Sequence, residues 1–440
     1  MASKQSALQL GKADQKEIEP IPTAGEIFPD GSAVELIRND GRLDLVGWDG
    51  QRATPGHAEH QGRRYLPPPI DPTVFQALRL PARIEPYGST RQLFQDVCEV
   101  FTRHKVLEEP ARLLTHFVFS TWLADCLPSA PCLWIVSPGG TDGGALLRLL
   151  AALTRRSLLL SEVTRAGFLA LPLHLQPTLL IEQHKLPKAL QSLLVASRTK
   201  GLGVPVSGEL RGVFGPRVIC TGHPLERFLS EGTIQISLTP QAGLLAVDED
   251  AIEDIAHRFQ PRLLAYRLTQ QQKARASKFD VADLSAPLRL LARSLGACVV
   301  DEPELQNGLT PLLREQDDGV RAENSASMEA VAVEAVLFYV HEGGKGSVYV
   351  NEIADAANGI LQNRGEPFGV EDRAVGGVLN RLGLFTTRLS GRGRGLRLQQ
   401  SVRRKVHELA RQYEVLTAEA KFSGCEDCSA GRQALGLASD

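Results

Sequence analysis

A short glycine-rich stretch has the residue types needed to bind phosphate. It follows the apolar run 133–136 and precedes a helix predicted over 146–153. In a strand–loop–helix of this kind, backbone N–H groups and the helix N-terminus can hold phosphate oxygens. The glycines that would form this loop are Gly139, Gly140, Gly143 and Gly144.

The residues that normally contact ATP and magnesium are missing from this loop. A nucleotide-binding loop reads G-x-x-x-x-G followed by Lys and then Ser or Thr. The glycine spacing is present from Gly139 to Gly144, but Ala145 and Leu146 occupy the next two positions. Starting the motif at Ser137 instead puts glycines there. The loop therefore lacks both the ammonium group and the magnesium-binding hydroxyl, and the alternative is a glycine-rich turn that binds nothing.

Two later apolar runs end in polar residues that would reach the same edge of a parallel sheet. The run 178–181 is followed by Glu182 and Gln183, where a Walker B strand would carry an Asp-Glu pair. The carboxylate that activates water is thus replaced by an amide. The run 217–220 is followed by Thr221, at the position of a polar sensor residue.

With these motifs in this order, residues 131–315 resemble the AAA-like P-loop ATPase domain of phage and plasmid primase–helicase proteins. The resemblance extends to Phe259–Arg267, which is similar to the helix that follows the sheet in that family. It implies an arginine, just before the last strand, that acts on the nucleotide of a neighbouring subunit. This chain has Gly232 at that position. The resemblance is also compatible with a homo-oligomer.

Three chemically distinct positions are therefore altered together: the phosphate cation, the water-activating carboxylate and the arginine. The nearest base to the loop is Arg148, one turn into the helix. Phosphoryl transfer depends on positioning and charge stabilisation, so we expect no turnover, no catalytic residue and no bound cofactor. One alternative is an active or weakly active ATPase or helicase, which would use ATP and Mg²⁺. Another is an unrelated α/β sheet whose turns imitate the motifs.

Residues 328–416 predict a second, DNA-binding unit. Their order is a helix (328–341), a short strand (347–350), helices from 352 and 371, a hairpin over 384–398 and a last helix (402–416). This order is that of a winged helix, in which the third helix enters the major groove and the hairpin lies along the phosphate backbone.

Positive charge supports binding to double-stranded DNA. Between residues 373 and 411 there are ten basic residues and one acid, Glu408, in a chain of net charge −2. The alternative is a protein–protein scaffold whose basic face is only solvated. The residues expected to contact DNA are Arg373, Arg388, Arg392, Arg394 and Arg397.

Cys425 and Cys428 have half the spacing of a zinc site. No second pair of Cys or His residues lies near them in the sequence, and a tetrahedral site needs four ligands. We therefore expect a dithiol in a flexible tail and no metal site within the chain; the alternative is a metal site between two molecules.

The elements that must position these residues imply several domains, because 440 residues exceed one ordinary core. A hydrophobic content of 43% excludes a wholly disordered chain, and no apolar run is long enough to span a membrane. Seven cysteines and no apolar leader favour reduced thiols in the cytoplasm.

The expected fold class is α/β, with an AAA-like parallel-sheet core. The expected divisions are a disordered tail (1–25), a small β unit (26–70), a helical connector (71–128), the degenerate ATPase-like domain (129–316), a linker (317–327), the winged helix (328–416) and a flexible tail (417–440).

Overall fold

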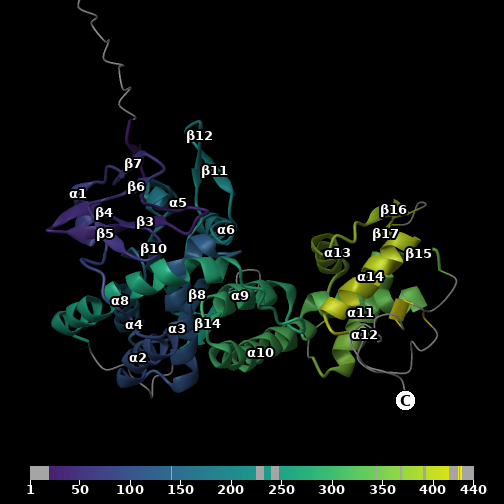
Figure 1. The fold of residues 1–440 in the computed structure, drawn as a ribbon. Coiled ribbons are helices and arrows are strands. Elements are labelled where there is room, and N and C mark those ends of the chain that lie inside the picture. Colours follow the sequence, from purple (N-terminus) through teal and green to yellow (C-terminus); the bar gives the residue numbers. More distant parts are fainter. Residues whose placement is uncertain are drawn as a thin grey trace, which may run out of the picture. The chain divides into compact units, whose positions relative to one another are not determined.

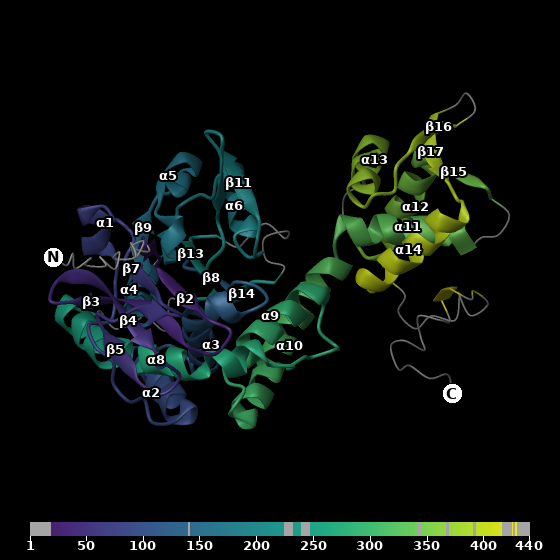
Figure 2. The ribbon, with the colours of Figure 1, turned by 45° about the horizontal axis from the view of Figure 1, so that its top comes forward.

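The protein forms two compact units, residues 1–314 and 315–440 (Figures 1 and 2). The structure is a computed structural model. It describes residues 19–139, 141–223, 232–238, 247–341, 345–366, 369–389, 393–415, 425 and 427–428. Most of both predicted tails lies outside these residues. None of the helices within these ranges is long and apolar enough to cross a membrane.

The described part of the first unit begins with two small sheets. An antiparallel sheet has the order β2-β3-β4-β5 and a smaller one the order β1-β7-β6. β3 and β4 form a hairpin, in which Asn39 pairs with Arg42, and Asp40 and Gly41 turn the chain with positive φ. The strands are β1 (Ile21–Pro22), β2 (Gly25–Ile27), β3 (Ala33–Asn39), β4 (Arg42–Trp48), β5 (Ala53–Pro55), β6 (Glu59–His60) and β7 (Arg63–Leu66).

These sheets are not a separate domain, which differs from the predicted division at residue 70. The first five residues of β3 are all buried, so both of its faces are covered. Ile37 belongs to the same hydrophobic cluster as Leu133 and Leu150, whereas Leu36 belongs to a second cluster with Trp134. The β unit therefore shares its core with the parallel sheet described next.

The predicted parallel sheet is confirmed and has the order β14-β8-β13-β10-β9. All four pairings within it are parallel. Continuous apolar runs are typical of strands buried on both faces. A mixed α/β unit with such a sheet is consistent with a P-loop, AAA-like core. Its strands are β8 (Cys132–Val136), β9 (Ser157–Ser161), β10 (Thr178–Glu182), β13 (Arg217–Thr221) and β14 (Ile234–Ser237).

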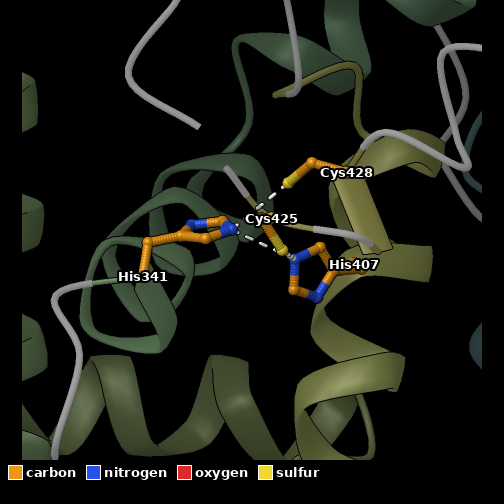
Figure 3. A group of neighbouring side chains, drawn as sticks. All are labelled: His341, His407, Cys425 and Cys428. Atoms are coloured by element: carbon orange, nitrogen blue, oxygen red, sulfur yellow. Dashed lines mark hydrogen bonds between the residues drawn. The ribbon is translucent and has the colours of Figure 1, made fainter. Parts of the chain in front are cut away.

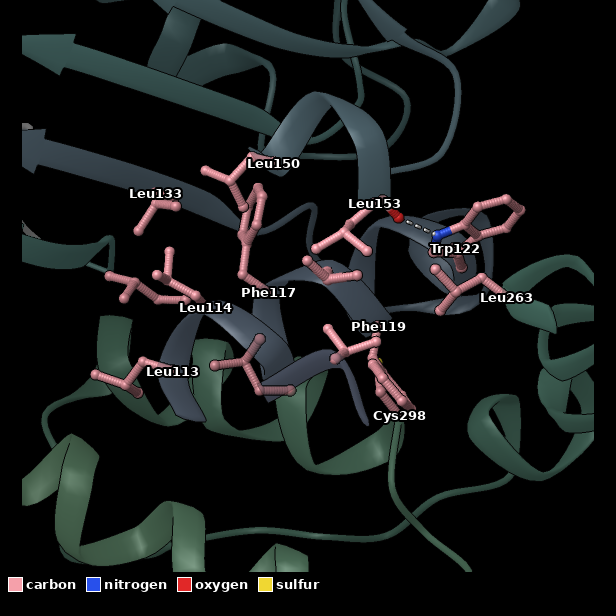
Figure 4. Close-up of a cluster of buried hydrophobic side chains, with 14 of the residues drawn as sticks. Leu113, Leu114, Phe117, Phe119, Trp122, Leu133, Leu150, Leu153, Leu263 and Cys298 are labelled. Carbon is pink, nitrogen blue, oxygen red and sulfur yellow. Dashed lines mark hydrogen bonds between the residues drawn. The ribbon is translucent and has the colours of Figure 1, made fainter. Parts of the chain in front are cut away.

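Helices cover this sheet, and one short hairpin projects from it. Figure 4 shows the core below the sheet, where Trp122 donates its indole N–H to the Leu153 carbonyl over 2.9 Å. The hairpin is β11 (Gly203–Val206) with β12 (Glu209–Gly212). The helices are α1 (Pro72–Ala77), α2 (Thr90–Arg103), α3 (Glu108–Leu123), η1 (Ala124–Cys126), α4 (Gly143–Leu153), α5 (Arg165–Ala170), η2 (Leu173–Leu175), α6 (Lys188–Ala196), α8 (Glu249–Arg275), α9 (Ala286–Ala297) and α10 (Pro303–Ser325).

The stretch expected to be a linker is largely helical, because α10 continues through Ser325. The division between the two units falls inside this helix, between Arg314 and Glu315. Its polar composition suggested a loop, but Arg321 forms ion pairs with both Asp317 and Glu414. These charges stabilise a helix that has few apolar residues to bury.

The second unit has the predicted order of elements and its own hydrophobic core. Its three-stranded sheet has the order β15-β17-β16, and both pairings are antiparallel. Its elements are α11 (Met328–His341), β15 (Ser347–Tyr349), α12 (Val350–Asn363), α13 (Asp372–Arg381), β16 (Thr387–Leu389), β17 (Gly393–Arg397) and α14 (Gln400–Gln412).

Candidate functional site

The parallel sheet brings the sequence-predicted site residues to one edge. β8 lies between β14 and β13, and the glycine-rich loop leaves its carboxyl end. Glu182 pairs with Cys220, and Thr221 pairs with Val136, so these strands end side by side. Ligands of open α/β sheets bind at this edge, where the strand order reverses. The glycine-rich loop, Glu182 and Thr221 therefore meet at this edge of the sheet.

The loop is closed by hydrogen bonds to its own side chains. Ser137 Oγ accepts from the Gly143 N–H over 3.1 Å and lies 2.6 Å from Thr141 Oγ1. Asp142 caps α4 and accepts from the Ala145 N–H over 2.8 Å. These two amides are among those that would face a phosphate in a nucleotide-binding loop. A Cβ atom added at Gly139 would have no neighbour within 4 Å, and Gly140 lies outside the described residues.

The loop is also negatively charged where a phosphate would have to bind. A Cβ atom added at Gly144 would lie 3.4 Å from Asp142 Oδ1 and 3.9 Å from Glu182 Oε1. Burial raises the pKa of the Cys220 thiol, and the charges of Glu182 and Asp142 raise it further, to about 12. Both carboxylates thus act on the same small space. They would repel an anion in the place where a P-loop attracts one.

Packing fills the space at the start of α4. Ala145 and Leu146 are fully buried. A Cβ atom at Gly143 would overlap Cys220 Sγ and Ser137 Oγ, so this glycine serves close packing. The exposed Arg148 lines a different hollow, of about 440 Å³, whose lining includes Arg79, Glu249 and Glu253 but no residue of the loop.

Gln183 is used as a cross-link between two loops. Its Oε1 accepts from the Val163 N–H over 2.8 Å, and its Nε2 donates to Glu162 Oε2 over 3.0 Å and to the Lys185 carbonyl over 3.1 Å. The amide therefore suits this position because it both donates and accepts. A carboxylate here could make only the first of these bonds.

Changing Gln183 to Glu should consequently lower stability without creating ATPase activity. The new carboxylate would face Glu162 and the Lys185 carbonyl, so we expect a loss of about 1–3 kcal/mol in the free energy of unfolding. Urea denaturation measures this loss. The double variant Gln183→Glu/Glu162→Gln restores a donor opposite the new carboxylate and should recover part of it. Equal stability of Gln183→Glu and the parent would contradict the cross-link.

The sensor and arginine positions also have structural roles. Thr221 Oγ1 accepts from the Trp134 indole over 2.8 Å and donates to the His223 carbonyl over 2.7 Å. Gly232 has φ of +69°, and an added Cβ would lie 3.2 Å from Pro287 and 3.3 Å from an Arg198 nitrogen. A larger residue at Gly232 would be strained in its backbone and crowded.

The second candidate site is the basic surface of the second unit. Arg388 pairs with Arg394 across β16 and β17, so their side chains project from the same face of the hairpin. Arg373, on α13, and Arg394 line one hollow of about 650 Å³. Arg397 is exposed, and Arg392 lies outside the described residues. Among the described residues, Arg373, Arg388 and Arg397 form no ion pair with an acid.

Other bases of the same cluster are used internally. Arg381 forms an ion pair with Glu329, and Arg403 donates to the carbonyls of Val340 and Leu398. Lys405 donates to the Gly383 carbonyl. The sequence could not separate these two groups of cations, because both are spread over the same helices and strands.

Sequence reasoning missed two features of these sites. Asp142 closes the glycine-rich loop, and its signal was its position as an N-cap residue. His341 and His407 lie beside Cys425 and Cys428, so the two cysteines are not simply part of a free tail. No local signal marks these histidines, since 66 residues separate them.

The chain matches no protein-family model and no curated protein. Among solved structures, it is similar to "SCCmec type IV Cch - active helicase", at 12% identity over 73% of this chain and 72% of that one, with a TM-score of 0.35. The apo C-terminal region of NrS-1 is 10% identical over 83% of this chain and 96% of that one, with a TM-score of 0.36. Drosophila ORC bound to DNA is 14% identical over 76% and 95%, with a TM-score of 0.19. Similarities of this size do not assign a function, and the core is described by its own parallel sheet and glycine-rich loop.

Proposed function

We propose that this protein is a DNA-associated, non-hydrolysing relative of P-loop ATPases, with a winged helix as its second unit. The observation that carries the first part is the closed glycine-rich loop, in which Asp142 and Ser137 occupy backbone N–H groups of α4. A carboxylate that caps the helix N-terminus already fills the position where a phosphate would be stabilised.

The other altered positions support the same proposal. Gln183 is held by Glu162 and Val163, and Gly232 is packed against Pro287. Phosphoryl transfer needs a positioned water and compensation of the developing negative charge. Neither an amide fixed in a cross-link nor a crowded glycine supplies these.

The DNA-binding part rests on the exposed arginines of the second unit. Like charges directly opposite each other across a β-ladder are unfavourable, and Arg388 and Arg394 are such a pair. An anion bound by Arg388 would reduce this cost, whereas Arg394 already donates to the Thr386 hydroxyl and carbonyl. Arg373 lies near the start of α13, across the same hollow as Arg394. In a winged helix these positions would meet base edges and phosphates, respectively.

The absence of ATP turnover is testable with the full chain. We expect no magnesium-dependent phosphate release above that of a Glu182→Gln variant, because the loop carries neither a cation nor a hydroxyl for magnesium. Phosphate release with ATP and Mg²⁺ measures this. Ala145→Lys should also stay inactive, since the residues at 183 and 232 are unchanged. Turnover in the parent that Glu182→Gln abolishes would instead establish an active ATPase.

A protein-docking scaffold is the second candidate, and one observation favours it. Phe385, between α13 and β16, is 74% exposed, and Phe338 on α11 is 50% exposed. Exposed aromatic side chains are common at protein interfaces. A protein that binds no duplex DNA at low salt would have this function rather than the first.

A further inference from the structure

Two histidines and two cysteines of the second unit meet at one point, although they are far apart in the sequence (Figure 3). His341 is the last residue of α11, and His407 lies in α14, which packs against α11. Cys425 and Cys428 come from the chain that follows α14. One ligand atom of each side chain lies within 4.8 Å of those of the other three.

The distances within this group fit a small tetrahedron. The Nε2 atoms of His341 and His407 are 3.1 Å apart. Cys425 Sγ lies 3.2 Å from the His407 Nε2, and Cys428 Sγ lies 3.2 Å from the His341 Nε2. For metal bonds of about 2.0–2.1 Å to nitrogen and 2.3 Å to sulfur, a tetrahedron has edges of about 3.3 Å (N···N) and 3.6 Å (N···S). The observed separations are only a few tenths of an ångström shorter.

The orientation of His407 leaves its Nε2 free to coordinate a metal. Its Nδ1 lies 2.7 Å from the Arg403 carbonyl, which can only accept, so Nδ1 carries the proton and Nε2 carries a lone pair. A second hydrogen bond of this kind fixes the ring and the tautomer of metal-binding histidines.

We propose that His341, His407, Cys425 and Cys428 form a structural Zn²⁺ site. Four protein ligands of the type Cys₂His₂ close the coordination sphere, which is the arrangement of structural rather than catalytic zinc. Two thiolates and two imidazoles select zinc over magnesium or calcium, which prefer oxygen ligands. Cys425 and Cys428 supply two of the four ligands from one C-x-x-C motif.

The site would hold Cys425 and Cys428 against α11 and α14 of the second unit. Three contacts join these residues to helices. Cys428 contacts His341 of α11, and Cys425 contacts His407 of α14. Arg411 of α14 donates to the Asp427 carbonyl. Because metal binding is linked to folding, zinc should stabilise α11 against α14. This role does not depend on DNA binding or on the state of the glycine-rich loop.

The test is the metal content of the untagged full chain, purified in reductant without chelator and analysed by mass spectrometry of metals. We expect about one zinc per chain, and a more than tenfold lower content in Cys425→Ser and Cys428→Ser. Cys98→Ser is the matched control, because Cys98 is a free, half-buried cysteine outside the group, and it should keep its zinc. Adding Co²⁺ to the chelator-treated parent should give the visible absorption of tetrahedral cobalt with thiolate ligands, which needs no variant to fold.

Three results would overturn the proposal. The first is a parent without zinc that also gives no tetrahedral cobalt spectrum. The second is a Cys425→Ser/Cys428→Ser variant that retains the parent's zinc. The third is a disulfide between Cys425 and Cys428. In parent purified separately without reductant and then denatured, such a disulfide would leave five reactive thiols, whereas a zinc site leaves all seven cysteines reactive after the metal is chelated.

Discussion

Replacing Glu35 by Gln is expected to destabilise the first unit by about 3–5 kcal/mol, the usual cost of removing one partner from a buried ion pair. Glu35 lies on β3 and is 1% exposed. It forms ion pairs with Arg155, Arg156 and Arg267, the first over 2.7 Å. Urea denaturation at neutral pH measures the loss.

The size of this effect follows from the number of buried charges. Arg267 also binds Asp125 through two hydrogen bonds of 2.7 and 2.6 Å, so three guanidinium groups share two carboxylates. Removing the Glu35 charge leaves Arg156 without its carboxylate in the interior. Burial, and then the neighbouring Arg155, already lower the pKa of Arg156 to about 9.

Glu253→Gln is the matched control, because Glu253 forms an ion pair with Arg79 at the surface. The Glu253 side chain is 46% exposed, so we expect a change of at most about 1 kcal/mol. If Glu35→Gln and Glu253→Gln lowered the free energy of unfolding by the same small amount, the Glu35 cluster would stabilise the protein no more than a surface ion pair does.

The same cluster predicts a loss of stability in acid. Burial alone would raise the pKa of Glu35, but Arg155, Arg156 and Arg267 outweigh it and lower the pKa from 4.5 to about 2. A lowered pKa gives stability that is complete above about pH 4.5 and is lost as the pH falls towards 2. The difference between the parent and Glu35→Gln should therefore shrink over this range. A difference that is constant with pH would contradict the assignment.

Replacing Arg373, Arg388 and Arg397 together by Ala should weaken DNA binding on the order of 100-fold at 0.1 M salt. These side chains are exposed and form no ion pair with a described acid, so they can neutralise phosphates. If the parent neutralises four phosphates, its log–log salt dependence has a slope of about −3.6, and losing three contacts leaves about −1. Fluorescence anisotropy with duplex DNA at several salt concentrations measures both values.

The control for this experiment removes the same charge elsewhere. Arg83, Arg103 and Arg314 are surface residues of the first unit, with side chains that are 56%, 63% and 55% exposed. Their triple Ala variant should bind DNA as the parent does, with an unchanged slope. If it weakened binding as strongly, the interaction would reflect net charge rather than the surface of the second unit.

The sequence by itself determined most of the elements. Three strands of the parallel sheet, β8, β10 and β13, begin within one residue of the apolar runs 133–136, 178–181 and 217–220, because buried strands are continuous apolar runs bounded by turn residues. Ser89 caps α2 in the same local way: its side chain accepts from the Gln92 N–H. Such signals are local, since they depend on residues within one turn or one hairpin.

The predictions from composition differ from the structure in segments that are held by residues far away in the sequence. Residues 317–325 are helical although they look like a linker, and β1 and β2 begin within the expected tail. In both places the segment is held by partners far along the chain: Arg321 by Glu414, and Ile21 by Tyr65. The sequences of these two segments do not indicate which distant residues they contact.

The chemistry of the sites was decided by the tertiary structure. The sequence shows at positions 145, 183 and 232 that the lysine, the carboxylate and the arginine are missing. It does not show that Gln183 binds Glu162, or that Asp142 and Glu182 lie close together. The His341 and Cys428 side chains, 87 residues apart, meet only because α11 packs against α14 and the following chain returns. Hydrogen bonds and metal coordination act over about 3 Å or less, so what these side chains can do depends on which distant segments the core brings together.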